Sequence, residues 1–217
     1  MSKASAMAAL VAKRKAARWD GYGGIGDYLG GIYECDHVSP LSIVAGNLDA
    51  TVMLILQDWD SEEGLKKPPA NPGLGYGPNS PTNKNLDALL QTYLRVTRNE
   101  VFATNLFPFV KPGGMSAAIP QSDLLRAARD YALPQVEIVN PALVVCFGLR
   151  TFNALRVASG GKAIGPMASA IEAPFTAPNG AKVWCQSHPG ALGRNNRNRG
   201  RVDRVSQDWA SMATALS

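Results

Sequence analysis

Three polar residues with different chemistry follow short apolar segments of the chain: Asp58, Asn105 and His188. A carboxylate can stabilise a cation or orient water, an amide carries a donor next to an acceptor, and a neutral imidazole can donate a hydrogen bond to developing negative charge. Together they form a polar constellation that is typical of a catalytic site. His37, the other histidine, has no such neighbours, and we interpret it as structural.

The surroundings of His188 indicate the kind of substrate. A short apolar run ends at this histidine, and a glycine-containing loop with Arg194, Arg197 and Arg199 follows it. A neutral imidazole beside a cationic loop indicates chemistry on an anionic polymer.

Four short runs rich in apolar and β-branched residues must position these side chains. They are too short for helices and too apolar for strands with one wet face, so they predict buried parallel strands. Segments with helical spacing separate them, and one contains Pro134, where we expect a kink. The alternation predicts a three-layer α/β/α sandwich with a central, mainly parallel four-stranded sheet. The expected strands are residues 51–56, 101–104, 143–147 and 183–186, and the expected helices are residues 85–96, 121–139, 149–158 and 204–216.

The predicted sheet brings the three polar residues to one edge. In open α/β sheets, ligands bind beyond the carboxyl ends of the strands. Asp58, Asn105 and His188 come at the ends of the first, second and fourth expected strands. The segment 59–83, rich in Pro, Gly and Asn, also starts there, and a connection of this length in a compact domain is usually functional or disordered.

Positive charge is concentrated in two places. The formal net charge is +5, and residues 1–18 carry five basic side chains and no acidic one. Both basic patches suit phosphate backbones, and both also fit plain solvated surfaces. We interpret residues 1–30 as a basic N-terminal extension that begins with an exposed helix, and residues 31–217 as a single domain. The two patches are Lys3, Lys13, Arg14, Lys15 and Arg18, and then Arg194, Arg197, Arg199, Arg201 and Arg204 beside Asp203.

Composition excludes several classes of protein. Cys35, Cys146 and Cys185 are far apart and odd in number, which argues against a disulfide framework and a four-cysteine iron–sulfur site. No apolar run reaches the roughly 18 residues of a membrane span. We therefore expect no membrane partner and a cytoplasmic location.

Six motifs occur in an informative order. The first strand leads into Gln57-Asp58-Trp59-Asp60, and Gly73-Leu74-Gly75-Tyr76 and then Pro78-Asn79-Ser80-Pro81-Thr82-Asn83 follow. Asn105 comes next, then a Pro-x-x-Val-Val-x-x-Gly pattern at 141–148, and finally His188-Pro189-Gly190-Ala191-Leu192. Over residues 50–215 this series resembles the uracil-DNA glycosylase superfamily, whose best-known branch has Gly-Gln-Asp-Pro-Tyr, Gly-Leu-x-Phe, a base-reading Asn and His-Pro-Ser-Pro-Leu.

The resemblance implies a monofunctional DNA glycosylase that acts in base excision repair. Such an enzyme flips a damaged, deaminated and uracil-like base out of DNA and hydrolyses its N-glycosidic bond, with no metal or other cofactor. It also implies a monomer that binds single-stranded or duplex DNA in the nucleoid. The implied catalytic residues are Asp58 and His188, the implied base contacts are Gln57, Tyr76 and Asn105, and the implied DNA contacts are Ser80, Thr82, Leu192, Arg194, Arg197 and Arg199, with Leu192 as a wedge.

The sequence departs from the family pattern at several positions. Trp59 replaces Pro, and Asp60 replaces the Tyr that blocks a 5-methyl group. Gly190 and Ala191 replace Ser and Pro. The motifs therefore indicate excision of a base more firmly than they indicate uracil.

Two alternatives remain open at this point. One is a catalytically inactive, nucleic-acid-binding member of the same fold. The other is a metal-dependent phosphohydrolase that uses Asp58 and Asp60, because Asp-x-Asp after an apolar strand resembles the nucleophile motif of haloacid-dehalogenase-like phosphatases. No Gly-Asp or Asp-Asp pair for Mg²⁺ follows in the sequence, which disfavours this second alternative.

Overall fold

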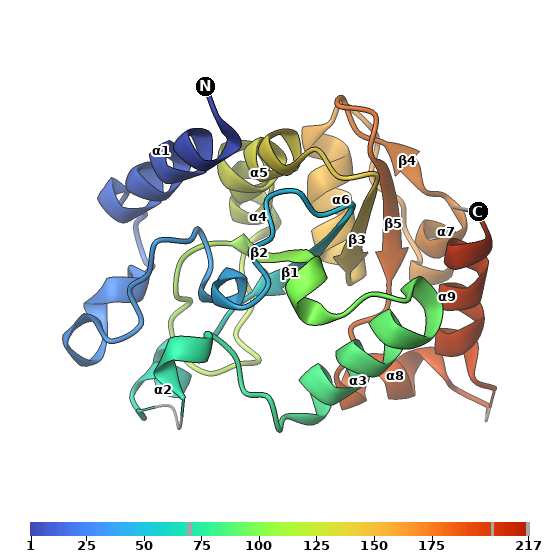
Figure 1. The fold of residues 1–217 in the computed structure, drawn as a ribbon. Helices are drawn as coiled ribbons and strands as arrows, with labels where there is room; N and C mark the ends of the chain where they lie inside the picture. The colour runs from blue at the N-terminus through green and yellow to red at the C-terminus, as the bar shows by residue number, and fades with distance from the viewer. Residues whose placement is uncertain (69–70, 201, 216–217) are drawn as a thin grey trace.

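A five-stranded sheet, in the order β2-β1-β3-β5-β4, crosses the part of the chain that this computed structural model describes, residues 1–68, 71–200 and 202–215 (Figure 1). Four strands are parallel, and β4 is antiparallel to β5. The strands are β1 (Val52–Asp58), β2 (Phe102–Phe107), β3 (Leu143–Phe147), β4 (Phe175–Thr176) and β5 (Lys182–Gln186). The helices are α1 (Lys3–Ala16), α2 (Glu62–Leu65), α3 (Pro81–Leu89), α4 (Gln121–Ala127), α5 (Leu133–Val139), α6 (Leu149–Ala158), α7 (Met167–Glu172), α8 (Ala191–Arg197) and α9 (Arg204–Thr214).

The predicted three-layer α/β/α fold is confirmed, but the predicted count of four strands is wrong. The additional strand, β4, has two residues, and it pairs with Lys182 and Val183 at the edge of the sheet. Two residues are too few to show an alternating pattern in a sequence. Strand β2 also runs to Phe107, so Asn105 lies inside this strand and not at its end.

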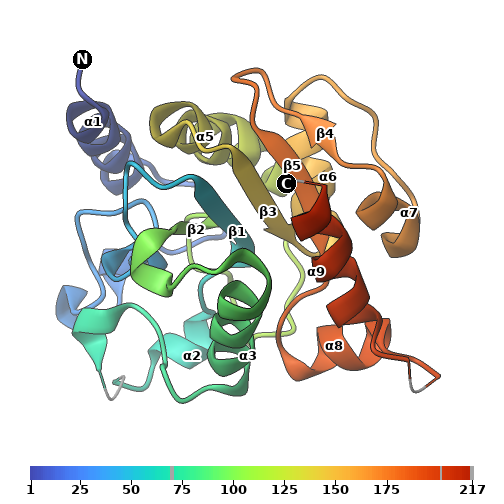
Figure 2. The same cartoon turned by 45° about the vertical axis from the view of Figure 1, so that its right-hand side comes forward.

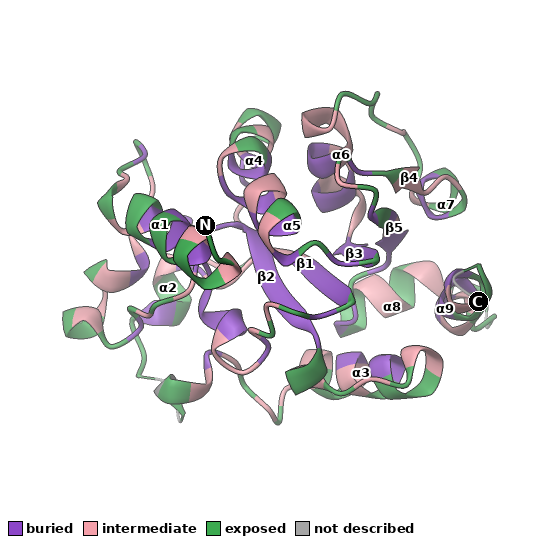
Figure 3. Ribbon diagram, turned by 45° about the horizontal axis from the view of Figure 1, so that its top comes forward, coloured by how far each residue is buried: buried purple, intermediate pink, exposed green. Residues whose placement is uncertain are grey.

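The strands are buried on both faces because helices cover each of them. Met53, Ile55 and Cys146 pack into one apolar cluster with α4, α5 and α6. Leu54 and Val145, which point the other way, pack with α3 and α9. Figure 2 shows α3 and α9 on the near side of the sheet, and Figure 3 shows the strands buried between exposed helix surfaces. This double cover explains why the strand sequences are continuously apolar.

The helices follow the sequence prediction with instructive differences. The segment 149–158 is helix α6, as predicted. The expected kink near Pro134 is a π-helical turn, Ala128–Ala132, between α4 and α5, which accommodates the missing N–H of proline. Helix α3 begins at Pro81 instead of residue 85 because the Ser80 hydroxyl caps it. Helices α2, α7 and α8 were not predicted. Leu216 at the end of the last expected helix, and Arg201, lie outside the described residues.

The basic N-terminal segment forms α1 and packs against the domain. Met7, Leu10 and Val11 are buried in the same cluster as Met53. In Figure 1, α1 lies at the top left, whereas α2, α3 and α8 lie in the lower part of the view. No helix of the described ranges is long and apolar enough to span a membrane.

Four of the five N-terminal cations are already paired with acidic side chains. The ion pairs are Lys3–Asp49, Lys13–Asp130, Arg14–Glu34 and Lys15–Asp36. Arg18 donates to the carbonyl oxygens of Lys15 and Ala17. The positive charge of this patch is therefore largely matched by acidic side chains of the domain.

Arg14 should be the strongest tether of α1. Its side chain is 2% exposed, pairs with Glu34 and donates to the carbonyl oxygens of Cys35 and His37. We expect Arg14→Ala to lower the free energy of unfolding by about 2–3 kcal/mol, because hydrogen bonds from a charged group are lost. Urea denaturation measures this, with Arg18→Ala, just after the end of α1, as the control. Equal stability of the two variants would show that α1 is not held by Arg14.

Candidate active site

A cavity of about 650 Å³ lies at the carboxyl edge of the sheet. Asp58 from β1, Asn105 from β2 and His188 after β5 all line it. Tyr76, Ser80 and Thr82 also line the cavity. A residue expected to contact the base and two expected to contact DNA therefore lie around the same cavity as the two catalytic candidates. Gln57, Leu192 and the three arginines do not line the cavity.

Asp58 is the last residue of β1, and its carboxylate is largely removed from water. The side chain is 8% exposed. One oxygen, Oδ1, accepts a hydrogen bond from Gln57 Nε2 at 2.8 Å, and the other, Oδ2, lies 2.6 Å from the ammonium nitrogen of Lys111. The Gln57 side chain thus supports Asp58, whereas the sequence suggested that it contacts a base.

Sequence reasoning missed Lys111 completely. Its side chain is 3% exposed, and lysine is rarely buried unless it is paired. The residue lies in an irregular loop after β2, in the run Val110-Lys111-Pro112-Gly113, which has the composition of an ordinary surface turn. The ion pair between Lys111 and Asp58 joins two segments that are far apart in the sequence, so no local sequence pattern predicts it.

His188 is held with its Nε2 side available. The backbone N–H of Gly190 donates to Nδ1 at 3.0 Å, so the proton of the neutral ring belongs on Nε2. Loss of water around the ring lowers the pKa of His188 below 6.5, and the charge of Asp58 opposes this shift. The ring is therefore neutral at pH 7 and can act as a hydrogen-bond donor.

The loop around His188 depends on Gly190 and on a contact from α3. A Cβ atom at position 190 would lie 2.9 Å from both His188 Nδ1 and Thr82 Oγ1. The carbonyl oxygen of Pro189 accepts a hydrogen bond from Asn85 Nδ2 at 2.9 Å. The departure from the family's serine at position 190 thus lets the α3 side of the cavity approach the histidine closely.

Asn105 is buried, with 2% of its surface exposed, at the floor of the site. Its Nδ2 donates to Ser39 Oγ at 2.6 Å, which sets the orientation of the amide. The amide retains a second hydrogen and its carbonyl oxygen for a ligand. Ser39 was also missed: it caps the short helical turn Pro40–Ile43, and nothing in the sequence indicates its contact with Asn105.

An aromatic wall completes the cavity. The Tyr76 ring is covered by the guanidinium of Arg98, 4.4 Å from the ring centre, and Arg98 is paired with Asp87. Trp59 Nε1 donates to the carbonyl oxygen of Gly75 and ties the Tyr76 turn to the end of β1. Gly75 has a φ of +67°, and a Cβ there would collide with the Pro40 carbonyl.

A model of the uracil DNA glycosylase superfamily matches residues 43–211. The chain belongs to this superfamily. Its members are generally DNA glycosylases, hydrolases that act on DNA. A comparison with curated proteins gave no match.

The positions that distinguish this chain within the superfamily lie around the carboxylate. Asp60 lines the cavity next to Asp58, and its Oδ1 accepts a hydrogen bond from the Ser61 N–H. Burial raises the pKa of Asp60 above its ordinary value, the Ser61 hydrogen bond opposes this, and the charge of Asp58 adds to it. No three His, Cys, Asp or Glu side chains of the described ranges are grouped so that they would hold a metal ion.

Ser80 and Leu192, two of the residues expected to contact DNA, differ in whether their side chains are already engaged in the fold. The Ser80 hydroxyl is occupied as the cap of α3, where it accepts from the Asn83 N–H and Nδ2. Leu192, in the first turn of α8, is 77% exposed. It follows His188, which lines the cavity, by four positions in the sequence.

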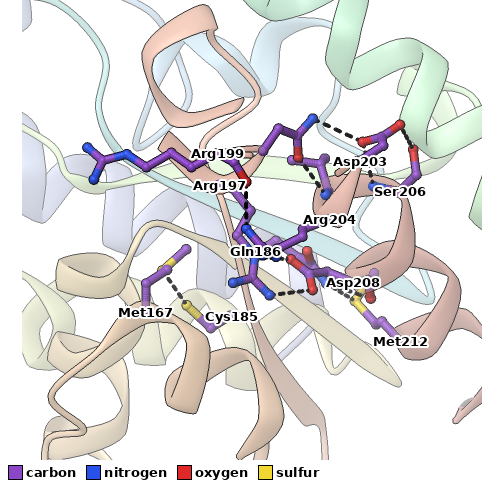
Figure 4. A network of polar contacts seen from close by, with 12 residues as sticks. Met167, Cys185, Gln186, Arg197, Arg199, Asp203, Arg204, Ser206, Asp208 and Met212 are labelled. Carbon is purple, nitrogen blue, oxygen red and sulfur yellow. Dashed lines mark hydrogen bonds and ion pairs between the residues drawn. The ribbon is translucent and has the colours of Figure 1, made fainter. Parts of the chain in front are cut away.

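The three arginines after Leu192 are not equivalent. Arg197 binds both oxygens of Asp208, at 2.6 and 2.8 Å, and so joins α8 to α9 (Figure 4). Arg194 donates to Asn85, and Arg199, which is exposed, donates to Asn196. The structure therefore uses Arg197 in the fold and leaves Arg199 as the most accessible of the three.

The neutral state of His188 gives a testable pH dependence. Because its pKa lies below 6.5, the ring stays neutral down to that pH, and protonation of Nδ1 at lower pH breaks the bond from Gly190. We expect base release to fall below pH 6.5, approaching about tenfold per pH unit. Single-turnover rates measured from roughly pH 5 to 8 check this. His188→Gln should remove this limb, and a limb that survives in the variant would belong to another group.

Proposed function

We propose that this protein is a monofunctional DNA glycosylase that flips a damaged, uracil-like base into the cavity and hydrolyses its N-glycosidic bond in base excision repair. The observation that carries the proposal is the meeting of Asp58, Asn105 and His188 in one cavity of about 650 Å³ in a member of the superfamily. A base inside a duplex is out of reach, so it must leave the stack at a cost of a few kcal/mol.

The roles follow from the charges that develop in the reaction. As the N-glycosidic bond breaks, the sugar acquires oxocarbenium character and the base leaves with the bonding electrons. Asp58 stabilises the cation and orients the water whose oxygen adds to C1′. The Nε2–H of His188 donates to the negative charge on the base, which takes up a proton as it departs. The products are the base and an abasic site.

The cavity walls select and hold the base. The Asn105 amide, oriented by Ser39, matches the O4 and N3–H edge of a pyrimidine. Tyr76 stacks on the base, a contact worth about 1–3 kcal/mol in related settings. Asp60 stands where the superfamily's methyl-blocking tyrosine would be, so we infer that the range of bases is wider than uracil alone.

DNA is held around the mouth of the cavity. Leu192 fills the space that the flipped base leaves, and Arg199 and Arg194 bind the flanking phosphates. Thr82 and the backbone near Ser80 contact the strand from the α3 side. We place the protein in the cytoplasm with the nucleoid, and as a monomer.

Incubating the protein with oligonucleotides that contain uracil, hypoxanthine or other lesions, followed by hot alkali, tests the proposal. A strand break at one type of lesion supports a glycosylase. Salt-sensitive binding without breaks at any lesion would instead identify an inactive DNA-binding member of the fold.

Asp58→Asn should separate chemistry from binding. We expect a loss of about 10²–10⁴ in the single-turnover rate, because the amide cannot stabilise the cation or activate water. The dissociation constant for lesion-containing DNA, from fluorescence anisotropy, should change little. Thermal unfolding serves as the control for stability, and an unchanged rate in the folded variant would remove Asp58 from the mechanism.

Leu192→Ala should impair duplex substrates more than single strands. A wedge has a role only where a stack must be refilled, so we expect roughly a tenfold loss on duplex DNA, about 1.4 kcal/mol, and a smaller loss on single strands. Val202→Ala, another exposed apolar residue, is the matched control. Equal losses on both substrates would argue against the wedge.

A further inference from the structure

Lys111 contacts the carboxylate on which the proposed reaction depends, although it does not line the cavity itself. Its ammonium nitrogen lies 2.6 Å from Asp58 Oδ2 and donates to the carbonyl oxygen of Met115, also at 2.6 Å. Both charged side chains are nearly fully buried. The ammonium therefore joins the end of β1 to the loop that carries Met115, whose side chain is exposed at the cavity mouth.

The backbone keeps this ammonium in place. Ser61 and Lys111 form a parallel bridge, and the Glu62 N–H donates to the carbonyl oxygen of Lys111 at 2.9 Å. The Glu63 N–H donates to the carbonyl oxygen of Gly113 in the same way. The loop after β2 is thus fastened to the segment that directly follows Asp58.

The electrostatic surroundings of Asp58 require such a partner. The groups that face it are Gln57, which donates one hydrogen bond, Asp60, which is a second carboxyl group, and His188, which is neutral at pH 7. A carboxylate that is removed from water needs a compensating charge, and none of these three supplies it. Lys111 is the cation in contact with it.

We propose that Lys111 is a positioning residue for base excision: it fixes the orientation of Asp58 and balances its charge while the site is closed to water. This inference rests on the proposed glycosylase function. It assigns no contact with DNA to Lys111, because the ammonium is covered by Asp58 and by the Met115 carbonyl. It also explains why a lysine beside the carboxylate is compatible with a monofunctional enzyme, since a buried, ion-paired ammonium is not a nucleophile.

Three substitutions test the role of the charge. Lys111→Met removes it, Lys111→Gln keeps a hydrogen-bond donor without it, and Lys111→Arg retains it. We expect Lys111→Met and Lys111→Gln to lower the single-turnover rate about 100-fold at pH 7 with DNA affinity nearly unchanged, and Lys111→Arg to restore part of the rate. Lys66→Met is the matched control, because Lys66 is exposed and forms an i,i+4 ion pair with Glu62 on the surface.

Rescue by the conservative variant distinguishes this role from a merely structural one. A variant that is only less stable loses active protein, and its rate per folded molecule is unchanged. Loss of positioning lowers the rate of the folded molecule, and the retained charge of Lys111→Arg restores part of that rate.

A double-variant cycle completes the test. If Lys111 acts through Asp58, Asp58→Asn combined with Lys111→Met should be no slower than Asp58→Asn alone. This double variant also removes the unpaired buried charge, so it remains informative where Lys111→Met does not fold. Independent losses, no rescue by Lys111→Arg, or a borohydride-trapped adduct of Lys111 with DNA would overturn the proposal. Absence of base release by the unaltered protein would instead refute the proposed function, and the two failures are thereby distinguished.

Discussion

The parallel pairing of β1, β2, β3 and β5 is the constraint on which the site depends. Parallel strands end at the same edge of a sheet, so residues separated by 130 positions in sequence, from Asp58 to His188, meet at one cavity. The two faces of the sheet are closed by helices, so strand side chains that meet a ligand lie at this edge. Asn105 lies within β2 and lines the cavity, although it is largely buried with Ser39 as its partner.

The charged groups at this edge of the sheet are balanced against one another or kept neutral. One carboxylate is matched by a buried ammonium, a second has its pKa raised by burial, and the histidine is kept neutral by loss of water. The Asp58–Lys111 pair and the neutral imidazole thus add no net charge to this edge. In the proposed reaction, the charges that develop on the sugar and on the base would meet groups that are already oriented.

The fold and part of the site were predictable from local patterns, and the rest depends on contacts between distant segments. Continuous apolar runs predicted β1, β2, β3 and β5, because strands covered on both faces need apolar side chains throughout. Strand β4 was missed because two residues show no alternating pattern. The short helix α8 was missed because its seven residues include a glycine and are mostly polar, so they show no apolar periodicity. The same distinction holds for the side chains of the site. Asp58, Asn105 and His188 were predicted because each follows an apolar run in the sequence. The contacts of Lys111 and Ser39 form only when their loops fold onto the sheet.

The pairing of the N-terminal cations changes where the protein is positive. Lys3, Lys13, Arg14 and Lys15 are matched by acids that lie elsewhere in the sequence, so the formal excess of +5 is carried by other parts of the surface. Arg199, which is exposed just after α8, belongs to these parts. Positive charge that the linear sequence concentrates in residues 1–18 is therefore largely matched by acids once the chain folds, and the face around α1 carries much less net charge than its sequence indicates.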